Sequence, residues 1–146
     1  MSMRSAFTIV EMVVVVLILG ILAAAAVAGQ AVRQQMLSAN EGALRRSLTV
    51  LRDGIETWYA ENGRIPSSDP DYADLISRLR GSKLPTVSVG GGDPSMVAGV
   101  TNGTPLSGTG LADVNGQAMW KYDSTTGEMI INFHAPSSTG EYYDRW

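Results

Sequence analysis

The chain has few side chains that can do covalent or acid–base chemistry. It contains no cysteine and one histidine, His134, in 146 residues. The lack of cysteine excludes disulfides, thiolate zinc sites, iron–sulfur clusters and cysteine nucleophiles within this chain. A single histidine argues against a histidine-based metal site or a hydrolase triad, and we expect His134 to be a surface residue rather than a base. The composition therefore does not favour an enzyme.

Three carboxylates lie close together in the sequence, at Asp69, Asp71 and Asp74. Calcium is bound by carboxylate oxygens, so this cluster is a candidate calcium site. The pair Asp69-Pro70 is also the pattern with which a helix begins, the aspartate capping and the proline occupying the first turn. We expect helix capping rather than a metal site, and we expect no cofactor.

The charge of the chain argues against a nucleic-acid partner. Eleven Lys and Arg residues stand against 14 Asp and Glu residues, which gives a net charge of -3. Proteins that hold nucleic acid through its phosphates carry basic surfaces instead. The length of 146 residues corresponds to one domain of ordinary size.

Glu11 is unusual because it lies beside a long apolar stretch. Residues 12–32 are 21 consecutive residues without a charge. About 20 apolar residues in a helix cross a hydrocarbon core of roughly 30 Å. A carboxylate at the centre of a membrane costs about 2 to 3 kcal/mol, and less near its edge. The apolar stretch predicts a membrane anchor, and the presence of the acid requires an explanation.

The residues from Phe7 to Val27, FTIVEMVVVVLILGILAAAAV, resemble the N-terminal signature of type IV pilins and of the pseudopilins of type II secretion systems. The resemblance implies that prepilin peptidase cuts between Ala6 and Phe7 on the cytoplasmic side and methylates the new amine. The family usually has glycine before the cut, where this chain has Ala6. Phe7 and Glu11 match the family by position.

Two explanations are available for Glu11. Its carboxylate can pair with the Phe7 amine of a neighbouring subunit, or it can lie in the first turn of its own helix, where an acid is favourable. Pairing between subunits explains better why an acid is kept among apolar neighbours. We therefore assign Glu11 to assembly.

A secretory signal peptide is the rival interpretation of the apolar stretch. Ala26-Val27-Ala28 before Gly29 is a site of the kind that signal peptidase cuts, which would remove the anchor. Helical periodicity passes through this site, however, at apolar positions spaced by three and four. These positions are Val32, Met36, Ala39, Ala43, Leu44, Leu48, Leu51, Ile55, Trp58 and Tyr59.

One long helix from Phe7 to Asn62 follows from this periodicity. Asn62-Gly63 and then Pro66 supply its end. Its 56 residues would rise roughly 84 Å. We assign the opposite face of its second half to solvent, with Arg33, Gln34, Asn40, Glu41, Arg45, Arg46, Arg52, Asp53, Glu56 and Glu61.

The remainder of the chain predicts short elements. We expect a short helix from Pro70 to about Arg80, short strands at Pro85–Val89 and Met96–Thr101, and a hairpin of residues 119–122 and 129–133 with Gly127 in its turn. The aromatic residues near position 146 must pack on the sheet or meet a partner. The three tryptophans are assigned to packing rather than to a carbohydrate platform.

These features predict an α+β, pilin-like fold, in which a long N-terminal helix packs on a small antiparallel β-sheet head. Residues 1–6 form a prepilin leader, and residues 7–32 the half of the helix that spans the membrane and forms the filament core. Residues 33–146 form the head, which includes the amphipathic second half of the helix.

The resemblance implies a non-enzymatic structural subunit of a type IV pilus-like or type II secretion pseudopilus filament. Its partners would be further copies of itself, other pilins or pseudopilins, prepilin peptidase, membrane lipid, and an assembly platform with its ATPase motor. It would lie in the inner membrane with its head outside the cytoplasm, and then in a periplasmic or cell-surface filament. The alternative is a membrane-anchored or secreted binding protein that does not polymerise.

Overall fold

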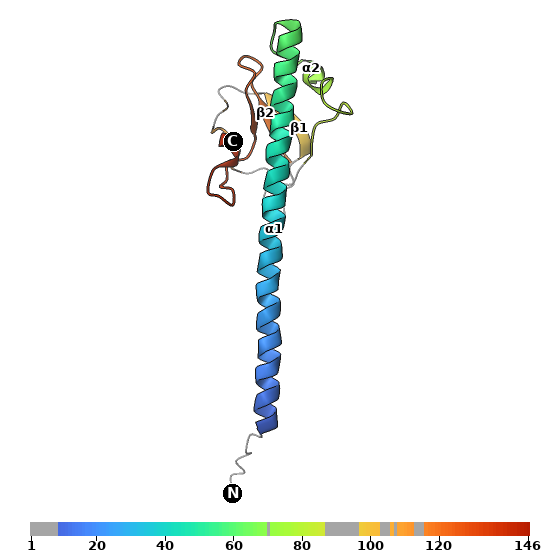
Figure 1. The fold of residues 1–146 in the computed structure, drawn as a ribbon. Coiled ribbons are helices and arrows are strands. Elements are labelled where there is room, and N and C mark those ends of the chain that lie inside the picture. The colour runs from blue at the N-terminus through green and yellow to red at the C-terminus, as the bar shows by residue number, and fades with distance from the viewer. Residues whose placement is uncertain (1–8, 70, 87–96, 103–105, 107, 113–115) are drawn as a thin grey trace. The chain divides into compact units, whose positions relative to one another are not determined.

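The computed structural model describes residues 9–69, 71–86, 97–102, 106, 108–112 and 116–146, without the side chains of residues 26–28, 97 and 98 (Figure 1). Ala6 and Phe7 lie outside these residues, as does most of the predicted strand Pro85–Val89. The chain divides into two compact units, Met1–Met36 and Leu37–Trp146. Helix α1, Ile9–Asn62, contributes residues to both. A long N-terminal helix and a small three-stranded sheet give the predicted α+β, pilin-like arrangement.

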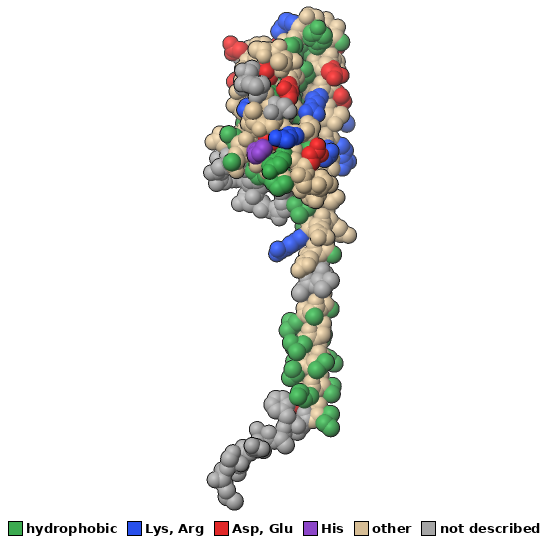
Figure 2. Space-filling model, turned by 90° about the vertical axis from the view of Figure 1, so that its left-hand side faces the viewer, with side chains coloured by type: hydrophobic (Ala, Val, Ile, Leu, Met, Phe, Trp, Pro, Cys, Tyr) green, Lys and Arg blue, Asp and Glu red, His purple; other side chains and the backbone are tan. Residues whose placement is uncertain are grey.

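The first unit is the apolar part of α1. Its large side chains from Ile9 to Leu22 are all exposed, from 43% at Val15 to 84% at Ile9. In Figure 2, hydrophobic side chains gather along this stretch of the helix. By length and composition α1 can cross a membrane. A helix suits that role because it satisfies its backbone hydrogen bonds internally.

The second unit has a core built on one side of α1. Leu44, Leu48, Leu51 and Ile55 are buried at helical spacing, as the periodicity predicts. They pack in one cluster with buried residues of α2, β2, β3, η1 and the segment after α2: Leu75, Leu79, Met119, Trp120, Tyr122, Met129, Ile131 and Tyr143. The burial of these side chains is the main stabilisation of the head.

Helix α1 ends at Asn62, as the sequence predicts. Gly63 follows the last helical residue with φ of +66°, and its N–H donates to the Tyr59 carbonyl at 2.8 Å. Glycine adopts this left-handed conformation without the steric cost of a Cβ, and the bond satisfies a carbonyl of the last turn. The sequence Asn62-Gly63 is therefore a correct stop signal.

The sheet is mixed, so the prediction of an antiparallel sheet is wrong in part. Strand β2, Ala118–Tyr122, pairs antiparallel with β3, Met129–Ile131, which confirms the hairpin. Strand β1, Val97–Asn102, confirms the predicted strand within one residue, but it pairs parallel with β2. The connection 103–117 is long enough to bring the chain back to the starting end of β1, whereas a tight turn forces antiparallel pairing.

The hairpin turn is organised by Asp123. Its Oδ1 accepts hydrogen bonds from Thr125 N–H and Oγ1 at 2.7 and 2.5 Å. These bonds, with those from Thr126, hold the pKa of Asp123 below its usual range although burial opposes them. Gly127 supplies the left-handed residue with φ of +79°. Asp123 is thus a turn residue.

The prediction of the short second helix is wrong in its extent and in its N-cap residue. Helix α2 spans only Ala73–Ile76, and its N-cap is Tyr72 with no side-chain hydrogen bond. Asp71 and Tyr72 have φ of 48° and 56°, which interrupts any helix that starts at Pro70. Leu75 and Leu79 of this segment are nevertheless buried in the core.

The C-terminal residues pack on the head. The 3₁₀-helix η1, Tyr143–Arg145, places the Tyr143 ring 5.8 Å from Phe133 and 4.9 Å from Trp146. Trp120 is fully buried and donates from Nε1 to the Pro85 carbonyl. Figure 1 shows the C-terminal segment and α2 on opposite sides of the head part of α1. The aromatic tail and Trp120 are packing residues, as predicted.

Candidate functional site

Glu11 lies in the first turn of α1. The N–H groups of a first helical turn lack partners within the helix and carry a partial positive charge, which favours a carboxylate there. This position agrees with both explanations of the acid. Because Phe7 and Ala6 lie outside the described residues, their processing and the pairing of Glu11 with Phe7 stay predictions.

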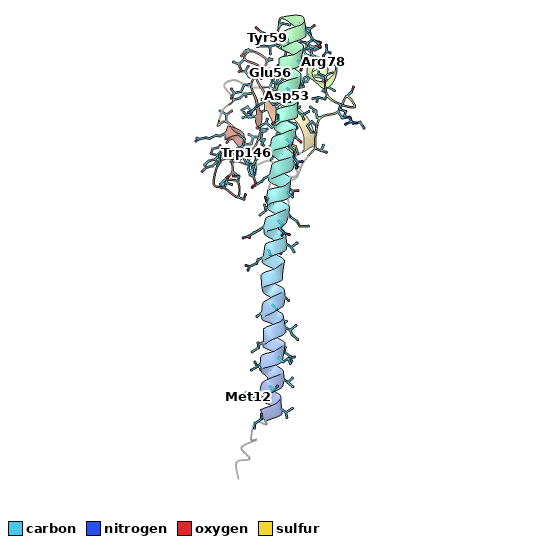
Figure 3. All side chains as sticks on the ribbon, in the orientation of Figure 1. Met12, Asp53, Glu56, Tyr59, Arg78 and Trp146 are labelled. Atoms are coloured by element: carbon cyan, nitrogen blue, oxygen red, sulfur yellow. The ribbon has the colours of Figure 1, made fainter. Side chains whose placement is uncertain are left out.

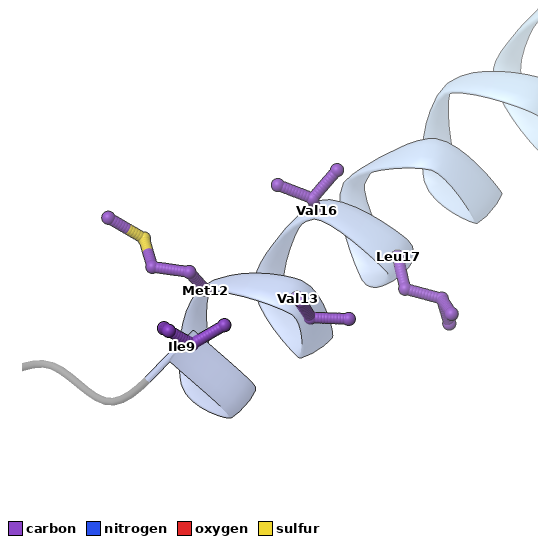
Figure 4. A pocket seen from close by; sticks show the side chains of 5 residues that line it. All are labelled: Ile9, Met12, Val13, Val16 and Leu17. Atoms are coloured by element: carbon purple, nitrogen blue, oxygen red, sulfur yellow. The ribbon is translucent and has the colours of Figure 1, made fainter.

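The helix surface around Glu11 is apolar and open. Five side chains line a hollow on it: Ile9, Met12, Val13, Val16 and Leu17. Figure 4 shows them projecting outward from successive turns of a single helix. They offer no hydrogen-bonding group that would orient a polar small molecule. Such a surface suits lipid chains or the apolar face of another helix.

In the head, Glu41 of α1 forms hydrogen bonds with the loop before η1 and with η1 itself. Its carboxylate accepts hydrogen bonds from the Ser138 N–H at 2.7 Å, from the Ser138 hydroxyl, and from the Tyr143 hydroxyl at 2.9 Å. Glu41 is only 8% exposed. Burial by itself raises the pKa of this carboxyl, but the hydrogen bonds from Ser138 and Tyr143 outweigh burial and lower the pKa below its ordinary value of 4.5.

Two arginines of α1 make further contacts with the C-terminal residues. Arg52 donates to the Met129 carbonyl and, at 2.5 Å, to the Trp146 carbonyl. Burial lowers the pKa of its guanidinium. Arg45 pairs with Glu141 at 3.1 Å and lies 3.8 Å from the centre of the Trp146 ring. Figure 3 shows Trp146 beside the head part of α1.

The assignment of Glu41 and Arg52 to the solvent face was therefore wrong. Glu41 lies three residues before Leu44, and Arg52 lies four residues after Leu48, so both border the buried stripe of the helix. Spacing alone could have placed them near the core. Which loop would supply the hydrogen bonds could not be read from the sequence, because Ser138 lies 97 residues away from Glu41.

His134 is at the surface, as expected, but it is held by a buried acid. Its Nδ1 lies 2.8 Å from Asp144 Oδ2, which also accepts the Gly110 N–H at 2.8 Å. The histidine side chain is 37% exposed, and its ring stacks on Tyr142. Asp144 of η1 thereby holds the loops that contain Gly110 and His134. The contact between His134 and Asp144 is therefore structural, because it orients segments of the head.

The carboxylates first considered for calcium are dispersed. Asp74 accepts the Ser67 N–H and pairs with Arg64, both at 3.1 Å, while Asp69 and Asp71 are exposed. Within the described part of the chain, no group of three or more His, Cys, Asp or Glu residues is placed to hold a metal ion. Asp69 does not cap α2, so the expected reason for its presence was wrong.

Comparison with known proteins identifies the N-terminal segment. Residues 1–27 match the prokaryotic N-terminal methylation motif, the signature of type IV pilins and pseudopilins. The match includes Ala6, Phe7 and Glu11 and ends within the apolar part of α1. No similar curated protein and no similar solved structure was found. The motif implies a pilin-like protein that is processed by prepilin peptidase, and the apolar helix fits a membrane-anchored protein.

Proposed function

We propose that this protein is a structural subunit of a filament of the type IV pilus or type II secretion pseudopilus kind. One observation carries the proposal. The methylation motif of residues 1–27 runs directly into a helix whose apolar side chains are exposed, and the same helix then supplies the core of a folded head. This combination suits a subunit that is stored in the membrane and assembled through its helix.

Assembly follows from the apolar surface of residues 9–22. Such a helix leaves the bilayer only if other apolar surfaces cover it, and a bundle of like helices replaces lipid contacts by protein contacts. A head-to-tail contact between identical subunits does not close on itself, and it gives a filament. We assign the energy for extraction to an ATPase motor acting through an inner-membrane platform protein.

Cleavage between Ala6 and Phe7 prepares the contact. It leaves an ammonium group on Phe7, four residues from the Glu11 carboxylate of the same chain and available to the Glu11 of a neighbour. An ion pair in a medium of low dielectric is favourable only when both charges are matched and hydrogen-bonded. An incoming subunit that brings its amine to Glu11 satisfies this condition.

The proposal is tested by a Glu11→Ala variant. We expect the variant to reach the membrane fraction and fold its head normally, because the change makes the anchor more apolar and lies outside the head. Filament yield after shearing should fall to background, because each incoming subunit loses a charge-assisted contact. Glu56→Ala is the matched control, since Glu56 is an exposed acid of the same helix (Figure 3).

The outcomes separate the candidate functions. Normal filaments from Glu11→Ala would reduce Glu11 to an ordinary first-turn acid. Loss of the variant from the membrane fraction would mean that Glu11 supports insertion instead of polymerisation. Absence of filaments from the unaltered protein, with and without companion pilins, would favour a membrane-anchored protein that does not polymerise.

A further inference from the structure

Arg33 is isolated in an unusual way. It is the single charged residue between Glu11 and Glu41 in the sequence. It lies on α1, and its side chain is exposed. Val32 and Met36 are 52% and 62% exposed, and Gln30, Gln34 and Gln35 are exposed as well, so Arg33 lies where the apolar surface of the helix meets polar surface. No part of the proposed filament contact at Glu11 explains a cation at this place.

The spacing between Glu11 and Arg33 matches the thickness of a membrane. The 22 residue steps that separate them along α1 rise about 33 Å. The hydrocarbon core of a bilayer is roughly 30 Å thick. Both charges therefore reach the two polar interfaces at once only in a narrow range of helix depths. Moving the helix by one turn in either direction would draw one of them into hydrocarbon.

We propose that Arg33 binds the phosphate groups of phospholipid headgroups at the outer face of the membrane and thereby fixes the depth of α1. The proposal rests on the membrane-anchored, processed subunit proposed above. A guanidinium matches the geometry of a phosphate, to which it donates two parallel hydrogen bonds. Its long aliphatic stem lets the charged end reach the interface from a backbone position at the edge of the hydrocarbon.

Depth matters because processing takes place at the other end of the same helix. A continuous helix transmits an axial shift at Arg33 to Glu11, and the peptide bond between Ala6 and Phe7 comes only four residues before Glu11 in the sequence. Arg33 is thus a positioning residue for cleavage, acting from the opposite face of the bilayer. It differs from Glu11, whose proposed partner is another subunit.

The test exchanges Arg33 with Gln30, an exposed residue of the same helix. The double variant Gln30→Arg, Arg33→Gln keeps the composition and moves the charge by three residues, or about 4.5 Å. Arg33→Lys is the matched control that keeps a cation in place. Because the chain has no cysteine, single cysteines introduced at positions 29–37 report which residues a membrane-impermeant maleimide reaches.

We expect the exposure boundary in whole membranes to move by three residues in the exchange variant and to stay in place in Arg33→Lys. The fraction cleaved at Phe7 should fall by more than half in the exchange variant, since the cleaved bond is drawn toward hydrocarbon. An unchanged boundary would overturn the proposal. If the unaltered protein were neither membrane-bound nor cleaved at Phe7, the proposed function itself would fail, which is a different result.

Reconstitution identifies the ligand. In vesicles of phosphatidylethanolamine and phosphatidylglycerol, Arg33→Gln should shift the boundary relative to the unaltered chain. In vesicles of digalactosyldiacylglycerol, which has no phosphate, the two proteins should have the same boundary. A difference of equal size in both kinds of vesicle would show that Arg33 responds to the aqueous interface and does not bind phosphate.

Discussion

The two halves of α1 have the same helical backbone, but their large apolar side chains are exposed in the first half and mostly buried along one stripe of the second. Leu19 in the first unit is 60% exposed, whereas Leu51 in the second is fully buried by the head. The head part of the helix gains its stabilisation within the chain. The apolar side chains of the first part can be buried only by its surroundings, which we propose to be lipid and then other subunits. Periodicity distinguishes them, because only the second half has a polar face.

The two acids Glu11 and Glu41 repeat this contrast. Glu41 is satisfied inside its own head by Ser138 and Tyr143. Glu11 lies in an apolar stretch, and we propose that its carboxylate binds the Phe7 amine of a neighbouring subunit during assembly. One carboxylate therefore serves folding and the other assembly, and variants at the two positions should separate these processes.

The largest effect is expected at the two leucines. Leu51→Ala should destabilise the head by about 3 kcal/mol, since it removes a fully buried side chain and leaves a cavity. Leu19→Ala should leave the unfolding of the head unchanged. Urea unfolding of the full chain in detergent, followed by tryptophan fluorescence, measures this directly because all three tryptophans lie in residues 37–146. Equal destabilisation by both variants would contradict the contrast.

A pair of glycines sharpens the comparison. A Cβ on Gly110 would lie 2.7 Å from the Phe133 carbonyl carbon, whereas a Cβ on Gly20 would meet nothing within 4 Å. Gly110→Ala should therefore destabilise the head by about 2 kcal/mol through overpacking. Gly20→Ala should leave the head unaffected. The same unfolding measurement applies, and a harmless Gly110→Ala would show that the backbone there moves aside easily.

The Glu41 contact predicts a dependence on pH. Because the folded pKa is lowered, the contact stabilises the head fully above pH 4.5, and the stabilisation is lost as the pH falls through the folded pKa. Glu41→Gln should cost about 1.5 kcal/mol at neutral pH, since an amide accepts these hydrogen bonds less well. The difference from the unaltered protein should shrink in acid. A difference that is constant with pH would exclude the ionised carboxylate as its cause.

The smallest effect is expected at Arg45. Its ion pair with Glu141 is half-exposed on both sides, so Arg45→Ala should cost less than about 1 kcal/mol, and less still at high salt. Arg46→Ala, an exposed neighbour, is the control. A loss as large as that of Leu51→Ala would show that the C-terminal segment depends on this surface contact.

Local signals predicted the parts of the fold that depend on local chemistry. The stop at Gly63 and the turn at Gly127 were correct because each requires a left-handed residue that glycine supplies. The hairpin was correct for the same reason. The helix expected to begin at Pro70 was wrong because Tyr72 adopts a left-handed conformation, and its ring packs edge-on against Tyr122. Tertiary packing decided against local propensity there.

Long-range pairings were not predictable from the pattern. Nothing local distinguishes the parallel alignment of β1 with β2 from an antiparallel one. The contacts of Glu41 and Arg52 join residues that are far apart in the sequence, and only the buried stripe beside them hinted at their position. For the candidate site, the resemblance of residues 7–27 pointed to the methylation motif that was found. The roles of Ala6, Phe7 and Glu11 within it stay predictions.

Intact-mass and N-terminal peptide mass spectrometry of protein taken from membranes tests the central claim most directly. We predict a chain that begins at an N-methylated Phe7 and retains the whole apolar helix. A chain that begins at Gly29 would show that the apolar stretch is a secretory signal and would contradict the filament proposal. A chain that still begins at Met1 in cells with active prepilin peptidase would show that Ala6 does not support cleavage.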